Sequence, residues 1–173
     1  ETLDIYNHSF GSTYGGLNST MTRNLFANNV ARNPSVGMWG DLTFVNNVLF
    51  NWWNRTLDGG DYRSMWNLIN NYYKPGPITP EDSPIRHRIA KPESGSIDAN
   101  IYGRIYAHGN KIHDNEMVSN DNWAGGIQLG MSHDEATPYF DQIRSRKPFP
   151  MAEVRIMPAS EAFDWVLNNA GAT

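Results

Sequence analysis

The chain alternates short apolar runs with pairs of asparagine over much of its length. Each repeat has a run rich in Val, Ile, Phe, Tyr and Thr, then an Asn pair, then a second apolar run. Three segments follow this order closely and a fourth follows it loosely: residues 20–29, 41–51, 64–73 and 101–115. The runs are short and lack a sustained 3.6-residue period, so the pattern predicts β-strands and excludes helical repeats.

The spacing of the Asn pairs predicts a solenoid. The second residues of the first three pairs are Asn29, Asn47 and Asn71, which gives a repeat of roughly twenty residues with variable loops. Asparagine tolerates left-handed backbone, and its amide can hydrogen-bond to the coils above and below. We therefore expect a parallel β-helix with Asn at its turns. An antiparallel sandwich with Asn-containing turns is the alternative.

Two regions depart from this pattern. Four prolines lie between residues 75 and 84, so residues 75–96 are expected to form a long loop that leaves the stack. Near the end, apolar residues share one helical face between Pro158 and Gly171: Ala159, Ala162, Phe163, Val166 and Leu167. This spacing predicts a short C-terminal helix that covers an end or a flank of the stack.

These elements predict one domain. Its β-helix coils are expected in residues 1–118, including the 75–96 loop, and residues 119–173 are expected to form a loop region and a capping helix. A chain of 173 residues is long enough to bury a substantial core in one domain.

Composition excludes several function classes. The net charge is −4 and the isoelectric point about 5.7, which argues against nucleic-acid binding through phosphate neutralisation as the main role. No stretch approaches the roughly 18 consecutive apolar residues typical of a membrane span. The chain has no cysteine, so disulfides, thiol nucleophiles and cysteine–zinc sites are excluded.

Five motifs in order resemble the pectate lyase family (polysaccharide lyase family 1). They are NHSFGSTYGG (7–16), NLFANNVARNP (24–34), NNVLFNW (46–52), RTLDGGD (55–61) and NNYYKPGP (70–77). The tail SEAFDWVLNNAGAT (160–173) resembles the family more weakly. The resemblance implies a right-handed parallel β-helix and β-elimination on a uronic-acid polysaccharide, usually with calcium bridging enzyme and substrate. It also implies a secreted or periplasmic protein.

Members of this family are considerably longer, and the matching region corresponds to their C-terminal half. The resemblance therefore implies a companion N-terminal chain or fragment that completes the β-helix, because an uncapped half-solenoid exposes unpaired strand edges. It also places most calcium ligands outside this chain.

The resemblance implies that Arg32, in an R-x-P motif with Asn33 and Pro34, is the catalytic arginine. In the family this arginine takes the C5 proton, and at a minimum it stabilises negative charge on the substrate carboxylate. This sequence departs from the family pattern in two places. Gly37 occupies the position of a second arginine, and the segment His8–Phe10 has no lysine where the family often has one.

Five residues are the candidates for substrate binding: Arg55, Lys74, His8, Asn33 and Trp52. Arg55 leaves the next coil at an exit similar to that of Arg32, and its fork of N–H groups suits a uronate carboxylate. A salt bridge to Asp58 or Asp61 is its structural alternative. Lys74 leaves the following coil in the same way.

His8 either contacts substrate or has a structural role beside a glycine-rich turn. Trp52 and Trp53 could stack on sugar rings, and at least one of them is expected to pack inside the stack. Asp58 and Asp61 supply too few oxygen ligands for calcium by themselves. His108, His113 and Asp114 do not show a zinc-binding spacing and are interpreted as turn residues.

Two other functions are compatible with the same scaffold. A glycoside hydrolase would need a pair of carboxylates across the scissile bond, for which only Asp58 and Asp61 are available. A non-catalytic carbohydrate-binding β-helix would explain the missing lysine and second arginine.

Overall fold

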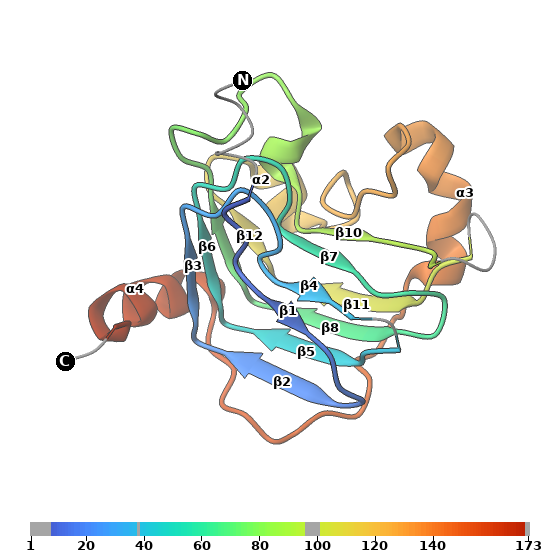
Figure 1. The fold of residues 1–173 in the computed structure, drawn as a ribbon, viewed down its shortest axis with the longest axis horizontal. Helices are drawn as coiled ribbons and strands as arrows, with labels where there is room; N and C mark the ends of the chain where they lie inside the picture. Colours follow the sequence, from blue (N-terminus) through green and yellow to red (C-terminus); the bar gives the residue numbers. More distant parts are fainter. Residues whose placement is uncertain (1–7, 38, 96–100, 172–173) are drawn as a thin grey trace.

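The computed structural model describes residues 8–37, 39–95 and 101–171. Its strands form three parallel sheets, and each sheet takes one strand from each of four successive coils (Figure 1). Consecutive strands of the chain lie in different sheets, so the backbone winds around the core as a parallel β-helix. The predicted coil architecture is therefore confirmed.

The strands of each sheet, in spatial order, share one wall of the coil. The first sheet contains β1 (Thr13–Tyr14), β4 (Ser35–Val36), β7 (Leu57–Gly59) and β10 (Ala90–Pro92). The second contains β2 (Ser19–Thr22), β5 (Leu42–Val45), β8 (Met65–Ile69) and β11 (Arg104–His108). The third contains β3 (Leu25–Ala27), β6 (Val48–Phe50), β9 (Tyr72–Lys74) and β12 (Lys111–Ile112).

The register stacks apolar side chains in columns inside the coil. One column on the second sheet joins Met21, Phe44, Leu68 and Ala107, and one on the third joins Phe26, Leu49, Tyr73 and Ile112. Nearly all of these side chains belong to one buried cluster. Since parallel strands are regularly spaced, each apolar residue meets its counterpart one coil away.

A ladder of asparagines, buried except at its first member Asn24, runs along one corner of the stack. The Oδ1 atom of Asn47 accepts from the backbone N–H and side-chain amide of Asn24, at 3.0 and 2.9 Å. Asn71, Asn110 and Asn122 continue the ladder with the same paired hydrogen bonds. Each rung therefore satisfies the backbone of a turn that is buried between coils.

The first rung differs from the sequence prediction. Asn29 was expected to align with Asn47, but Asn24 holds that position and the Asn29 amide donates to Asn33 Oδ1 instead. A left-handed residue precedes each of the first four rungs: Arg23, Asn46, Asn70 and Gly109, with φ of 58, 55, 49 and 67°. Arginine rarely adopts this conformation, which is why the first turn was not recognised from its sequence.

The 75–96 segment rejoins the stack before its predicted end. A short 3-10 helix covers Pro84–His87, and β10 then pairs in parallel with β7. The proline-rich part therefore connects two coils, and Ala90–Pro92 after it form β10.

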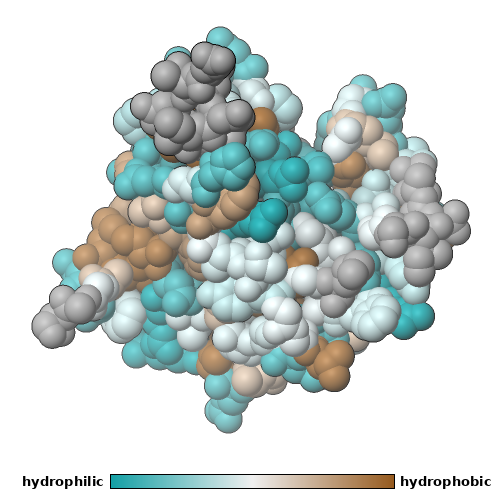
Figure 2. Space-filling view, viewed as in Figure 1, coloured by the Kyte–Doolittle hydropathy of each residue, from teal (hydrophilic) through white to brown (hydrophobic). Residues whose placement is uncertain are grey.

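The C-terminal helix is present, and it covers a flank of the stack. Helix α4 (Ala159–Asn169) packs Ala159, Val166 and Phe163 against Val48 and Tyr72 on the outer face of the third sheet. Leu167 lies outside this contact and is exposed. Figure 2 shows hydrophobic surface on and beside α4, consistent with the exposed Trp165 and Leu167.

Helix α3 (His133–Ile143) was not predicted. Its Ser132 N-cap accepts from the Glu135 backbone N–H, and the Glu135 side chain accepts from the Ser132 backbone. This capping box is a helix-start signal, and it was overlooked because the surrounding residues are polar.

The two ends of the stack differ. Helix α2 (Glu116–Asn120) and the following segment cover the fourth coil, where Asn122 ends the ladder and Ile127 bridges Ala90. In the described part of the chain, the first-coil strands β1, β2 and β3 each have a strand partner on one side only. None of the described helices is long and apolar enough to cross a membrane.

We predict that Asn71→Ala lowers the free energy of unfolding by about 2–4 kcal/mol, because it leaves the buried Asn47 N–H without its acceptor. Asn29 lies outside the ladder, so Asn29→Ala is expected to lower the free energy of unfolding by less than about 1 kcal/mol. Urea denaturation of both variants measures the difference. Equal losses would contradict the ladder assignment.

Candidate functional site

The register places three arginines at equivalent positions in successive coils. Ser35 of β4 pairs with Asp58 of β7, which pairs with Lys91 of β10. Arg32, Arg55 and Arg88 each lie three residues before one of these partners. One cation therefore precedes the first-sheet strand of the second, third and fourth coils.

A cavity of about 190 Å³ lies between the first two of these arginines. Its lining consists of Phe10, Val30, Ala31, Arg32, Trp53, Asn54 and Arg55. The Arg32 guanidinium lies 4.4 Å from the centroid of the Phe10 ring, a cation–π contact. The Arg32 side chain is exposed, so its N–H groups remain accessible from the cavity.

Arg32 has left-handed backbone, with φ of 58°. A non-glycine residue in this region carries a conformational cost of about 1–2 kcal/mol, and such residues concentrate at functional sites. Several turn residues of this stack share the conformation, so it identifies Arg32 as a turn residue of the coil.

Arg55 is bound to two carboxylates. Its Nη1 donates to Asp58 Oδ2 at 3.1 Å and to Glu93 Oε1 at 3.4 Å. Asp58 is fully buried, and this desolvation raises the pKa of its carboxyl, while Arg55 opposes the shift. The salt bridge considered for Arg55 from the sequence is therefore present, and the guanidinium still lines the cavity.

Arg88 was missed in the sequence. It is almost fully buried, and its guanidinium donates to Gln128 Oε1 at 2.7 Å and to the Asn54 carbonyl at 2.9 Å. Desolvation, followed by the positive charge of Arg55, lowers the pKa of Arg88 to about 10. Its contact with Asn54 fixes the loop that carries Trp53 and Arg55. The coil register would have identified Arg88, but the irregular 75–96 segment hides that register in the sequence.

The two tryptophans have different environments. Trp52 has 1% of its surface exposed, packs edge-on against Tyr73 and donates to the Ile85 carbonyl. Its ring is therefore part of the core and does not face the cavity, contrary to its selection as a sugar-stacking residue. Trp53 is 40% exposed and lines the cavity, so it is the tryptophan that can stack on a sugar.

Of the remaining candidates, His8 lies beside Phe10 of the cavity lining. Its ring is 6.0 Å from that of Phe10, which supports Arg32. Asn33 is 2% exposed and uses its side chain to bind the Arg55 carbonyl and the Asn29 amide, so it links coils. Lys74 lies on the third sheet, 5.6 Å from the Phe163 ring of α4, and does not line the cavity.

Asp58 and Asp61 are both bound to groups of the protein. Asp61 accepts from the N–H groups of Arg63, Ser64 and Trp39, while Asp58 is buried against Arg55. Within residues 8–37, 39–95 and 101–171, no group of three or more acidic or histidine side chains could hold a metal ion. Calcium prefers six to eight oxygen ligands, so these residues do not fit the ion on their own.

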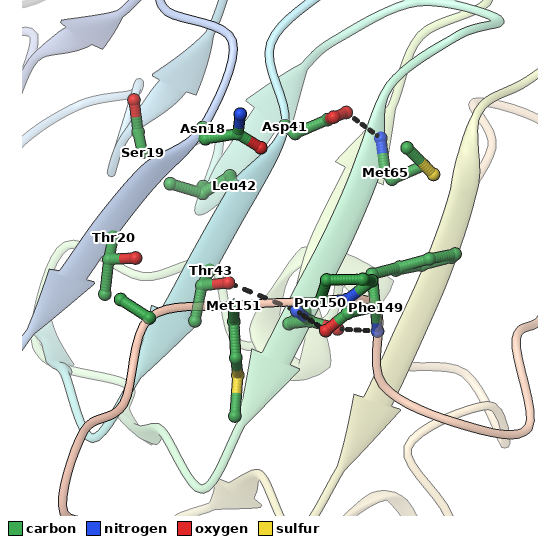
Figure 3. Close-up of a pocket in the computed structure, with 12 residues that line it drawn as sticks. Asn18, Ser19, Thr20, Asp41, Leu42, Thr43, Met65, Phe149, Pro150 and Met151 are labelled. Carbon is green, nitrogen blue, oxygen red and sulfur yellow. Dashed lines mark hydrogen bonds between the residues drawn. The ribbon is translucent and has the colours of Figure 1, made fainter.

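A second hollow, of about 390 Å³, lies on the outer face of the second sheet (Figure 3). Segment 149–152 crosses this face and is held there by two hydrogen bonds between Asn67 and the Phe149 backbone. The lining contains Asp41 and neutral residues but no Arg or Lys. It therefore lacks the cation that a uronate carboxylate requires.

Comparison with known proteins gives one consistent relationship. No family model matches the chain. The chain is 30% identical over 178 residues to proteins named "Probable pectate lyase C" from Aspergillus terreus and Neosartorya fischeri. The match covers 96% of this chain and 36% of each relative. A protein of the same name from Emericella nidulans is 30% identical over 172 residues.

The resemblance to the pectate lyase family is thus confirmed over nearly the whole chain. The chain spans about a third of the length of these curated relatives.

We predict that Asp58→Asn changes how stability depends on pH. Because burial raises the pKa of Asp58 above the ordinary 3.8, the folded protein binds this proton more tightly than the unfolded chain. Ionisation of Asp58 therefore costs stability as the pH rises through its folded pKa. The free energy of unfolding of the wild type, relative to the variant, should fall as the pH rises above about 3.8 and level off above the raised pKa of the folded state.

Urea denaturation across this pH range measures the effect. The difference in free energy of unfolding between wild type and variant could instead stay constant with pH, or grow in favour of the wild type. Either result would contradict the role of burial at Asp58.

Proposed function

We propose that this chain forms part of a pectate lyase-like enzyme that cleaves a uronic-acid polysaccharide by β-elimination, with Arg32 as its catalytic arginine. The observation that carries the proposal is the cavity in which the exposed Arg32 guanidinium, Arg55 and Trp53 converge. Cations that bind carboxylates and an aromatic ring that stacks on sugar are the groups that a uronate requires.

The reaction breaks a C–O bond without water. A base removes the C5 proton, the C5–H electron pair forms the C4=C5 double bond, and the bond from C4 to the glycosidic oxygen breaks. The leaving oxygen then takes up a proton. Negative charge builds on the C6 carboxylate as the C5 proton leaves, so a fixed cation at that carboxylate stabilises the transition state more than the ground state.

We assign Arg32 to this carboxylate and to the C5 proton beside it. Its guanidinium rests on Phe10, so its direction is fixed before substrate binds. A guanidinium normally keeps its proton, so its positive charge is available to the substrate carboxylate, whereas removal of the C5 proton requires the neutral guanidine form.

Trp53 and Arg55 are assigned to binding. The exposed Trp53 ring is suited to the apolar face of one sugar, and Arg55 has further N–H groups besides the Nη1 that binds Asp58. Asp58 holds Arg55 by one oxygen, which fixes the guanidinium at the cavity edge.

Two parts of the enzyme are proposed to lie beyond the described residues. Further coils would pair with the open edges of β1, β2 and β3, in keeping with the greater length of the relatives. Calcium ligands would come mostly from those coils. The substrate class implies a secreted or periplasmic location.

We expect Arg32→Ala to reduce formation of the unsaturated product by about 10²-fold or more, since the substituted residue stabilises charge only in the transition state. Ultraviolet absorbance of the C4=C5 double bond measures the rate on a de-esterified uronate polymer. Arg63→Ala is the matched control, because Arg63 is also exposed and stacks on Trp39 and Tyr62 away from the cavity.

Cleavage by Arg32→Ala at the parental rate would refute the catalytic role. Cleavage that yields only saturated products would indicate a hydrolase. Binding of the polymer by wild-type protein without any cleavage would indicate a carbohydrate-binding β-helix.

We further expect the active protein purified from its source to contain more than this chain. Intact-mass analysis under native and denaturing conditions should show a longer polypeptide or a companion chain. A single folded and active 19.6 kDa species would contradict completion of the stack by further coils.

A further inference from the structure

Glu93 forms ion pairs with two cations, Arg55 and Lys91. Its Oε1 lies 3.4 Å from Arg55 Nη1 and 3.6 Å from Lys91 Nζ. The residue follows β10 directly, and its backbone N–H donates to the Gly59 carbonyl at 2.8 Å. The stacking of the fourth coil on the third therefore fixes the position from which this side chain reaches the two cations.

These ion pairs contribute little to the stability of the fold. The Glu93 side chain is 45% exposed and that of Arg55 is 39% exposed, and pairs of this kind contribute little to stability. Their main consequence is electrostatic. Asp58 and Glu93 compensate Arg55 and Lys91, so these two cations are already paired with carboxylates of the protein.

Arg32 differs from its neighbours in this respect. Among the described residues it has no carboxylate partner, and its guanidinium contacts the Phe10 ring. Arg88 also has no carboxylate partner there, but it is buried and bound to neutral oxygens. Arg32 is thus the accessible uncompensated cation of the column.

A third hollow lies beside Glu93. It measures about 410 Å³ and is lined by Lys91, Glu93, Ser94, Tyr102 and neighbouring residues. The Arg55–Glu93 pair lies between this hollow and the Arg32 cavity. A polysaccharide that binds at Arg32 and continues along the coils would place its next sugars beside the Glu93 carboxylate.

We propose that Glu93 is a specificity-determining residue, which neutralises Arg55 and Lys91 and repels a second carboxylate beside the one bound at Arg32. The preferred substrate is then a chain whose uronate carboxylates are spaced by neutral or methyl-esterified sugars, and a chain with a carboxylate on every sugar is disfavoured. Discrimination by a built-in repulsive group is a common source of specificity. This inference rests on the proposed function.

The test compares Glu93→Gln with wild type on two polymers of one backbone, one fully de-esterified and one partly methyl-esterified. We expect the wild type to prefer the esterified polymer. Glu93→Gln should shift the ratio of kcat/KM values towards the fully charged polymer by about two- to fivefold, the range for one partly exposed charge pair. Glu161→Gln is the matched control, because Glu161 is an exposed, ion-paired glutamate on α4 and should leave the ratio unchanged.

Retardation of the same proteins in gels that contain each polymer separates this inference from the proposed function. Absence of unsaturated product from every protein would refute the lyase, while the ratio of retardations would still report the effect of Glu93. The inference is overturned if Glu93→Gln leaves both ratios at the wild-type value, if Glu161→Gln shifts them equally, or if neither polymer retards any of the proteins.

Discussion

Hydrogen bonding between successive coils is the constraint on which the rest of this structure depends. A parallel coil buries its turns, and each buried N–H and carbonyl group must find a partner. The asparagine ladder meets this requirement at one corner, because each amide oxygen accepts from the turn of one neighbouring coil and the amide nitrogen donates to the asparagine of the other. The ladder also fixes the register, so residues at equal distances from a rung stack above one another.

The fixed register brings residues from repeated positions of the sequence close together in space. Arg32, Arg55 and Arg88 are far apart in the chain, yet they lie at the same position of three neighbouring coils. Their environments then separate their roles. Arg88 is buried and holds the loop of the third coil, Arg55 is compensated by carboxylates, and Arg32 is exposed on an aromatic ring. One geometric position therefore holds a buried arginine, an arginine paired with carboxylates and an exposed arginine.

The sequence predicted the coil architecture because strand composition and Asn spacing are local signals. It also predicted the C-terminal helix, while the roles of Arg32 and Arg55 stay predictions. It failed where tertiary context decides. Asn24 replaced Asn29 in the ladder because the turn before it uses a left-handed arginine. Trp52 and Trp53 are adjacent in the chain, and only the packing against Tyr73 shows which one is buried. Arg88 and Glu93 lie in or just after an irregular connection whose length hides their alignment.

The central claim is that the carboxylate of a uronate sugar binds at Arg32, between Phe10 and Trp53. A crystal structure of the protein with a saturated uronate oligosaccharide would test it most directly. The account predicts a sugar carboxylate within hydrogen-bonding distance of the Arg32 guanidinium, with a neighbouring ring stacked on Trp53. An oligosaccharide bound instead in the hollow under segment 149–152, with Arg32 free of contact, would contradict it.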